Sequence, residues 1–186
     1  MTPEMIERLL MQGEMKSQAV TDEVCRILAL HPEYFDTVFD LMFSDEDETR
    51  MRAATVVLKT GRKQKLLLRE RKSRILDELL LLDHLQVNWM TARMMADLIY
   101  TAEEAARAFR RLKGFIKTPK IALRAGCMEA MTTIALQHQR YKKETVKAIN
   151  EVLKTGSAGE INVGKRMLAQ LEKKDAKPVT RNKKKQ

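Results

Sequence analysis

At 186 residues, the chain is long enough to bury one hydrophobic core of ordinary domain size, and its seven Gly and four Pro are too few for a turn-rich β-fold. No uninterrupted apolar run exceeds four residues, so the sequence predicts no transmembrane helix and, with Glu spread through the N-terminus, no signal peptide. The net charge of +10 is uneven, because residues 1–61 hold 6 basic and 12 acidic side chains while residues 62–74 hold 7 and 1.

The first quarter of the chain predicts three helices. Thr2 followed by Pro3 is typical of a helix start. Apolar residues at helical spacing indicate further helices at about 14–30 and 32–43. The acidic run SDEDE at 44–48 favours the start of a fourth helix, because negative charge stabilises the N-terminal end of the helix dipole.

The remainder of the chain contains an internal repeat of amphipathic helices. Four segments align without gaps, starting 38, 36 and 38 residues apart: TRMRAATVVLKT from Thr49, VNWMTARMMADL from Val87, LRAGCMEAMTTI from Leu123 and INVGKRMLAQLE from Ile161. Another amphipathic helix precedes each segment, at 32–43, about 65–82, 102–116 and 141–154. One helical hairpin cannot bury both of its faces, so we expect the pairs to stack. We expect TGRK, 60–63, to be a joint between pairs.

This pattern resembles that of small HEAT-repeat proteins of bacteria and archaea, whose second helices carry V-[RK]-x-x-A-x-x-A-L at a period of about 37 residues. The resemblance covers about residues 17–174. It implies an all-α fold, an α/α superhelix of about four HEAT-like helical hairpins plus an N-terminal cap, in a single domain over residues 1–174. We expect residues 175–186, which are Lys-rich and lack apolar periodicity, to form a basic disordered tail.

The second helix of each pair is expected to line the concave face of such a stack, where polar side chains recur. The candidate strip comprises Arg50, Arg52, Asn88, Trp89, Arg93, Arg124 and Asn162. Two interpretations are open. The polar residues at the second position of each segment form a ladder of hydrogen bonds to neighbouring turns, including Asp45 and Asp47, or they form a binding strip for a peptide or a nucleic acid.

The segment GRKQKLLLRERKSR, 61–74, contributes to a candidate basic patch with the helix at 102–116. The patch comprises Arg62, Lys63, Lys65, Arg69, Arg107, Arg110 and Arg111. Because Leu68, Ile75 and Leu79 fall on one helical stripe, we expect Arg62, Lys65 and Arg69 to lie on the outer, convex face. There they would be solvated, with auxiliary electrostatic contacts as the alternative.

The sequence contains no recognisable catalytic or metal-binding motif. His31, His84 and His138 fall near expected helix ends and form no metal-binding motif, and no phosphate-binding glycine loop is present. HEAT-like alkylpurine DNA glycosylases place a Trp and an Asp one helical turn apart. Here Arg93 lies one turn after Trp89, and Asp97 lies a further ~5–6 Å along the helix, which is too far for a general base.

We therefore expect a cytoplasmic, non-enzymatic HEAT-repeat scaffold or adaptor that binds a macromolecular partner, above all a protein, through its concave surface. Cys25 and Cys127 form no CxxC pair or disulfide framework, which fits reduced thiols. Neither a cofactor nor a membrane is expected. The alternative is a basic DNA- or RNA-binding module that makes non-specific phosphate contacts, and a glycosylase-like enzyme is the weaker third hypothesis.

Overall fold

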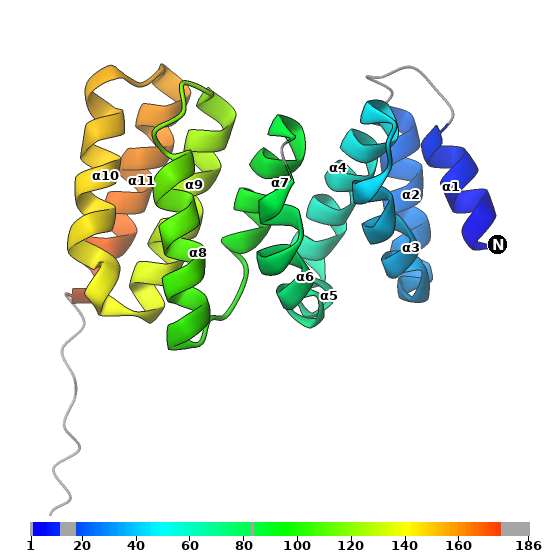
Figure 1. Cartoon of the computed structure of the whole chain (residues 1–186), viewed down its shortest axis with the longest axis horizontal. Coiled ribbons are helices and arrows are strands. Elements are labelled where there is room, and N and C mark those ends of the chain that lie inside the picture. Colours follow the sequence, from blue (N-terminus) through cyan, green and yellow to red (C-terminus); the bar gives the residue numbers. More distant parts are fainter. Residues whose placement is uncertain (1, 12–17, 83, 176–186) are drawn as a thin grey trace, which may run out of the picture.

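The computed structural model describes residues 2–11, 18–82 and 84–175, which form α-helices and 3-10 turns and contain no β-strand. The predicted all-α fold is therefore confirmed. The helices lie in two layers, and α1 (Pro3–Met11) covers their N-terminal end (Figure 1). The first layer holds α3 (Phe35–Asp40), α5 (Lys65–Glu70), α6 (Lys72–Asp77), α8 (Ala102–Phe115) and α10 (Lys142–Thr155). The second layer holds α2 (Gln18–Leu30), α4 (Asp47–Lys63), α7 (Leu85–Met95), α9 (Ile121–Gln137) and α11 (Ala158–Asp175).

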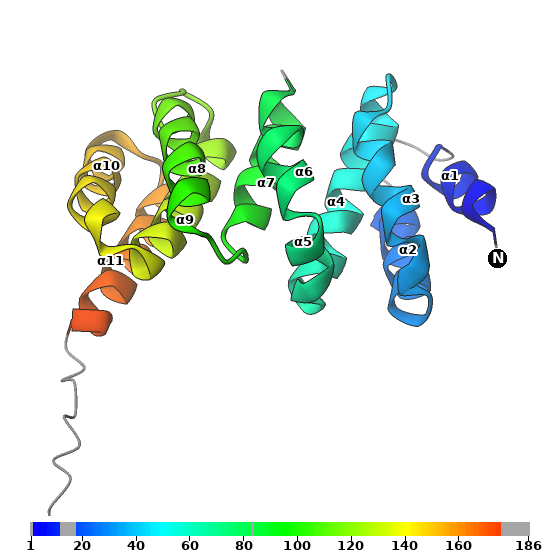
Figure 2. The same cartoon turned by 60° about the horizontal axis from the view of Figure 1, so that its bottom comes forward.

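The second layer is a continuous row in which each helix packs against the next one of the layer. Helix α4 lies between α2 and α7, and α9 lies between α7 and α11, as both views show (Figures 1 and 2). In the first layer, α3 packs on α4, while α8 and α10 pack on α9. Short 3-10 turns, such as η3 (Leu79–Leu81) before α7, complete the connections. Segments more than 30 residues apart in sequence thus become neighbours.

The aligned segments bury side chains at the same four steps, and this burial pattern corrects the alignment of the last segment. The buried residues are Thr49, Ala53, Val56 and Thr60; Val87, Thr91, Met94 and Leu98; Leu123, Cys127, Ala130 and Ile134; and Glu160, Gly164, Met167 and Leu171. The fourth segment therefore begins at Glu160, one residue earlier than predicted. In the corrected alignment, Gly164 takes the position at which the other segments have small or slim side chains. Space is limited there, because a Cβ on Gly164 would lie 2.8 Å from Leu153 Cδ2 of α10.

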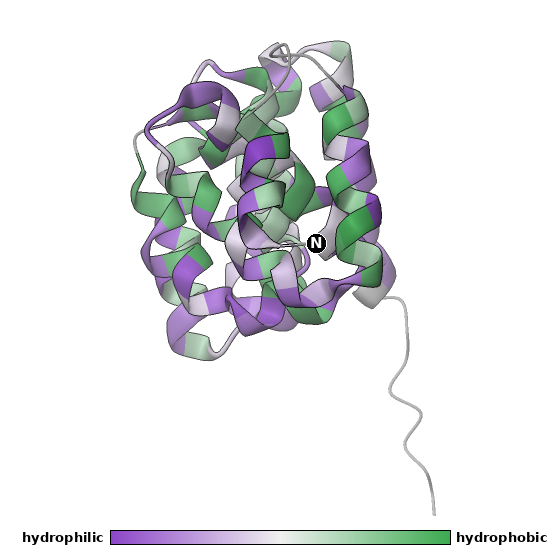
Figure 3. Ribbon diagram, turned by 90° about the vertical axis from the view of Figure 1, so that its right-hand side faces the viewer, coloured by the Kyte–Doolittle hydropathy of each residue, from purple (hydrophilic) through white to green (hydrophobic). Residues whose placement is uncertain are grey.

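The core between the two layers is rich in methionine. Met94, Met95, Met128 and Met131 have no exposed surface. Methionine is a good helix former and fills irregular gaps between packed helices. Seen from the N-terminal end, hydrophobic and hydrophilic residues alternate along single helices (Figure 3), as expected for helices that bury one side.

The predicted joint at TGRK is wrong, because α4 continues through Lys63. Gly61 is buried within the helix, and a Cβ on it would lie 2.4 Å from Leu68 Cγ. The glycine thus permits the close approach of α5 rather than ending α4. The chain turns at Gln64, whose φ is −121° and ψ is 72°. The single helix predicted over 65–82 is divided at Arg71 into α5 and α6 and ends in η3.

Other boundary signals act as the sequence predicts. The Thr2 carbonyl accepts from Met5 N at 3.1 Å as α1 begins. Asp47 and Glu48 of the acidic run lie in the first turn of α4, at its N-terminal end. None of the helices within the described ranges combines the length and apolar composition needed to cross a bilayer. The predicted tail lies outside the described residues from 176 onward.

Candidate binding surface

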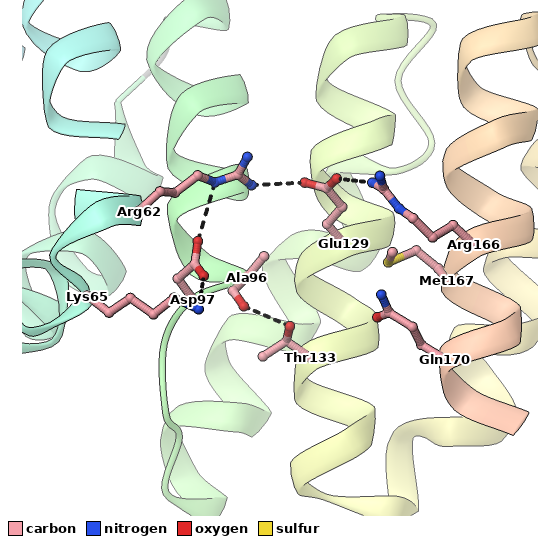
Figure 4. A pocket seen from close by; sticks show the side chains of 9 residues that line it. All are labelled: Arg62, Lys65, Ala96, Asp97, Glu129, Thr133, Arg166, Met167 and Gln170. Atoms are coloured by element: carbon pink, nitrogen blue, oxygen red, sulfur yellow. Dashed lines mark hydrogen bonds and ion pairs between the residues drawn. The ribbon is translucent and has the colours of Figure 1, made fainter. Parts of the chain in front are cut away.

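A pocket of about 440 Å³ lies where four second-layer segments meet the start of α5. We refer to it as the charged pocket (Figure 4). It is lined by Arg62, Lys65, Ala96, Asp97, Glu129, Thr133, Arg166, Met167 and Gln170. Arg62 comes from the end of α4, Glu129 from the middle of α9 and Arg166 from α11. With Asp97 from the connection after α7, four second-layer segments therefore contribute charged side chains to one hollow.

Two carboxylates occupy the centre of the charged pocket, and each contacts more than one cation. Asp97 lies 3.3 Å from Arg62 Nε and 2.9 Å from Lys65 Nζ. Glu129 lies 3.2 Å from an Arg62 terminal nitrogen and 2.7 Å from one of Arg166. Arg62 thus bridges both carboxylates, as Figure 4 shows. Bridging of this kind fixes both carboxylates relative to α4.

The pocket carries more positive than negative charge. Arg93 Nε lies 3.8 Å from Glu129, so Arg62, Lys65, Arg93 and Arg166 together surround two carboxylates. The pKa of Arg93 is lowered because burial disfavours the charged form and Arg62 repels it, although Glu129 acts in the opposite direction. Asp97 and Glu129 are only 14% and 15% exposed, while Lys65 and Arg166 are more than half exposed. The outermost charges that a ligand meets are therefore positive.

The backbone that carries Asp97 is held in place by side chains of α9. Thr133 Oγ1 donates to the Ala96 carbonyl at 2.8 Å. Gln137 Nε2 donates to the Leu98 carbonyl, and its Oε1 accepts from Tyr100 N, both at 2.8 Å. Side chains of α9 thus bond to the connection between α7 and α8 on both sides of Asp97. These bonds fix the position of Asp97 in the charged pocket.

The predicted strip does not form one surface. Arg50 bonds to the Asp45 carbonyl and to Asp47, both at 3.2 Å. Asn88 Nδ2 donates to the Leu82 carbonyl at 2.9 Å, and the Arg124 guanidinium contacts Glu160 at 2.6 Å. The Arg124–Glu160 contact joins neighbouring segments, as a polar ladder requires, whereas Arg50 and Asn88 bond within the turn that precedes their own helix.

The other strip residues are dispersed. Arg52 is buried and reaches back to Glu48 at 2.9 Å, so it lies on no exposed strip. Trp89 is partly buried against the core. Asn162 is exposed but falls outside the row once the fourth segment begins at Glu160. Of the predicted strip, Arg93 contacts a residue that lines the charged pocket, because its Nε lies 3.8 Å from Glu129.

The predicted basic patch is also divided. Arg62 and Lys65 line the charged pocket, so their predicted place on the outer face is wrong. The reason is the extension of α4, which puts Arg62 on a second-layer helix. Lys63 and Arg69 are exposed. On α8, Arg107 contacts Asp77 at 2.7 Å and Arg111 donates to the Leu80 carbonyl at 3.2 Å, whereas Arg110 is exposed.

The later cations of the same basic segment pair across the first layer. Arg71 makes two bonds to Asp36, at 2.7 and 2.8 Å, and its guanidinium lies 5.2 Å from the Phe35 ring centroid. Arg74 contacts Asp40 at 2.6 Å, and Lys72 contacts Glu104 at 2.7 Å. The Arg71 guanidinium, through these hydrogen bonds, holds the pKa of Asp36 below its usual value. These pairs connect α3, α6 and α8.

The histidines lie at helix ends, as predicted, but of the three only the His84 side chain caps a helix. His84 Nδ1 accepts from Val87 N at 3.3 Å and caps α7. His138 Nε2 contacts the Tyr100 carbonyl at 2.9 Å. Across the described ranges, no group of three or more His, Cys, Asp or Glu side chains could hold a metal ion.

Sequence reasoning did not identify the pocket as a unit, although a signal was present. In the corrected alignment, the seventh position holds Thr55, Arg93, Glu129 and Arg166, and the eleventh holds Lys59, Asp97, Thr133 and Gln170. Positions four apart lie on the same side of a helix. Charge at these two positions therefore marks the face of the second layer that carries the charged pocket.

No protein-family model matches the chain, and no curated protein matches it. A solved structure described as the crystal structure of an engineered protein from the Northeast Structural Genomics Consortium is similar, with a TM-score of 0.57 and 17% sequence identity. The match covers 90% of this chain and 80% of that one. At this identity the likeness concerns the fold alone.

Proposed function

We propose that the chain is a non-enzymatic HEAT-like scaffold or adaptor that binds a protein partner through the charged pocket. The repeated burial at the same four steps of the four aligned segments supports the HEAT-like assignment. The single observation that carries the binding assignment is the convergence of Arg62, Glu129 and Arg166 from three repeats on one hollow. Rows of stacked helices offer extended surfaces to which several repeats contribute.

The mixture of charges favours a protein over a nucleic acid. Asp97 and Glu129 lie in the middle of the pocket and would repel phosphate groups placed there. A polypeptide can place a carboxylate beside Arg166 and a Lys or Arg side chain beside Glu129 at the same time. Complementary potentials of both signs set specificity and the rate of association in such contacts.

The arrangement gives little support to a glycosylase. Asp97 is paired with Arg62 and Lys65 and lies beyond the turn that follows Trp89. Arg62 and Lys65 occupy the carboxylate oxygens with which a general base would have to reach its substrate. The proposed role therefore uses Asp97 to position cations rather than to accept a proton.

Cross-linking from inside the pocket tests this function. Gln170 is exposed and lines the pocket, so a photo-reactive amino acid at this position should capture the partner in cells that naturally express the protein. The matched position is Arg110 on α8, which is exposed and makes no ion pair within the described ranges. We expect a protein cross-link from position 170 that is absent from position 110. A product whose added mass is removed by nuclease would contradict the proposal.

Binding of the captured segment, made as a synthetic peptide, then shows which charges matter. Arg62→Glu combined with Arg166→Glu should weaken binding tenfold or more, while Arg110→Glu should have little effect. Glu129→Gln separates the two classes of ligand, because removing a negative charge strengthens binding of a nucleic acid but removes a contact from a mixed-charge protein segment. Tighter binding of random duplex DNA than of the peptide would refute a protein-binding role.

A further inference from the structure

A second hollow region lies at the edge of the molecule where α7 and α9 begin, the upper edge in Figure 1. Two adjoining hollows of about 500 and 340 Å³ share Leu85, Lys120 and Leu123. We call their union the edge groove. Its lining comes from the start of α7, from the end of α8, from the connection 116–120 and from the first turn of α9. None of these residues lines the charged pocket.

The edge groove exposes large apolar side chains. Leu85 is 39% exposed and Ile121 is 53% exposed, and they flank Trp89 and Pro119 in the same hollow. Phe115 lines the adjoining hollow. Single exposed apolar residues are common, but several around one hollow mark a surface that gains free energy when another molecule covers it.

The charged groups that line the groove are all positive and therefore suit an acidic ligand. Lys117 and Lys120 are exposed at its rim, and no Asp or Glu is among the residues that line either hollow. Lys120 is the N-cap of α9, and its side chain does not cap the helix. The first amides of this 17-residue helix therefore retain free hydrogen-bonding capacity, and the positive end of the helix dipole lies at the groove.

An unpaired polar group provides independent evidence for a ligand. Asn88 lines the larger hollow and is 7% exposed. Its Nδ2 donates to the Leu82 carbonyl, whereas its buried Oδ1 has no hydrogen-bond partner within the described ranges. This Oδ1 has almost no accessible surface, and a buried acceptor without a donor is unfavourable, so a ligand donor that reached it once the Asn88 side chain turned toward the groove would stabilise the site.

We propose that the edge groove binds an acidic, apolar segment of a second protein. Its apolar side chains would cover Leu85, Trp89 and Ile121, and a carboxylate would lie between the Lys120 side chain and the first amides of α9. The absence of acidic lining residues distinguishes this groove from the charged pocket, where two carboxylates require a ligand of both signs. The protein would therefore hold two different segments at once, as an adaptor does.

The chain contains one tryptophan, so its fluorescence reports on the groove directly. The probe is a dodecapeptide of leucine and glutamate, which has no tryptophan, and the reference is the same peptide with lysine in place of every glutamate. We expect the glutamate peptide to shift the Trp89 emission to shorter wavelength as water is displaced, and the lysine peptide to leave it unchanged. Equal response to both peptides, or no response to either at millimolar concentration, would overturn the proposal.

A matched pair of variants assigns the response to the groove. Ile121→Glu puts a negative charge in the groove and should weaken the glutamate peptide tenfold or more. Ile99→Glu is the control, because Ile99 is 54% exposed but lies at the opposite edge, in the connection before α8. Thermal unfolding of each variant verifies the fold. Equal affinity for the two variants would contradict the assignment. Arg62→Glu should not alter this response, so failure of the charged pocket and failure of the groove are separable.

Discussion

The two ends of the basic segment 62–74 use the same residue types for different purposes. Arg71 and Arg74 each face an acidic side chain of α3, and Lys72 faces Glu104, so their charges are neutralised by neighbouring first-layer helices. Arg62 and Lys65 instead share Asp97, and Arg62 also competes with Arg93 and Arg166 for Glu129. Cations that each have their own acidic partner connect neighbouring helices. Cations that outnumber their acidic partners leave a surface with net positive charge.

The close approach of α5 to α4 depends on Gly61, so its substitution should have the largest effect on stability. Gly61→Ala brings a Cβ into contact with Leu68 and should lower the free energy of unfolding by roughly 1–3 kcal/mol. Gly114→Ala is the control, because nothing lies within 4 Å of its Cβ, and a helical alanine should stabilise by up to about 1 kcal/mol. Urea denaturation of both variants measures the difference. Equal stability would show that α4 and α5 can separate at no cost.

Arg71, which is paired with Asp36, should contribute more to stability than the exposed Arg69 two residues earlier. Arg71→Ala removes a two-bond contact with Asp36 and the contact with the Phe35 ring, and should cost about 1 kcal/mol. Arg69→Ala, at an exposed side chain, should change stability by less than about 0.5 kcal/mol. Thermal unfolding compares the two variants. A larger loss for Arg69→Ala would contradict the distinction between paired and unpaired cations.

The smallest expected effect is a dependence on acid pH. The pKa of Asp36 is below its ordinary value of 3.8 in the folded chain, because Arg71 donates hydrogen bonds to the ionised form. Its contribution is therefore present above the unfolded pKa and is lost as pH falls below that value. Asp36→Asn should make the fall in unfolding free energy between pH 5 and pH 3 less steep. Asp45→Asn, at an exposed carboxylate, is the control, and an identical change in both variants would refute the assignment to Asp36.

Helical periodicity was sufficient to predict an all-α fold, because each helix buries one side and exposes the other. It failed at Gly61, where a glycine within a helix and a glycine that ends one look alike in sequence. Only the position of Leu68 distinguishes them. It also misplaced the fourth segment by one residue, because buried Glu160, paired with Arg124, looks polar and solvent-exposed in sequence.

The charged pocket was harder to predict than the fold. Arg62 and Glu129 are 67 residues apart, and their contact depends on the packing of α7 between α4 and α9. The seventh and eleventh positions of the segments carried the necessary information, but a search for charge at the second position selected residues that bond to neighbouring turns. Once the alignment is correct, charged residues that share one helix face predict this surface better than polar residues at the second position.

The most direct test of the central claim is the affinity of the protein segment that cross-links to position 170, measured for three forms of the purified chain. The account predicts that the double variant Arg62→Glu, Arg166→Glu binds at least tenfold more weakly than the natural chain, and that Arg110→Glu binds as the natural chain does. Equal affinity of all three forms would show that the charges of the pocket do not hold the partner.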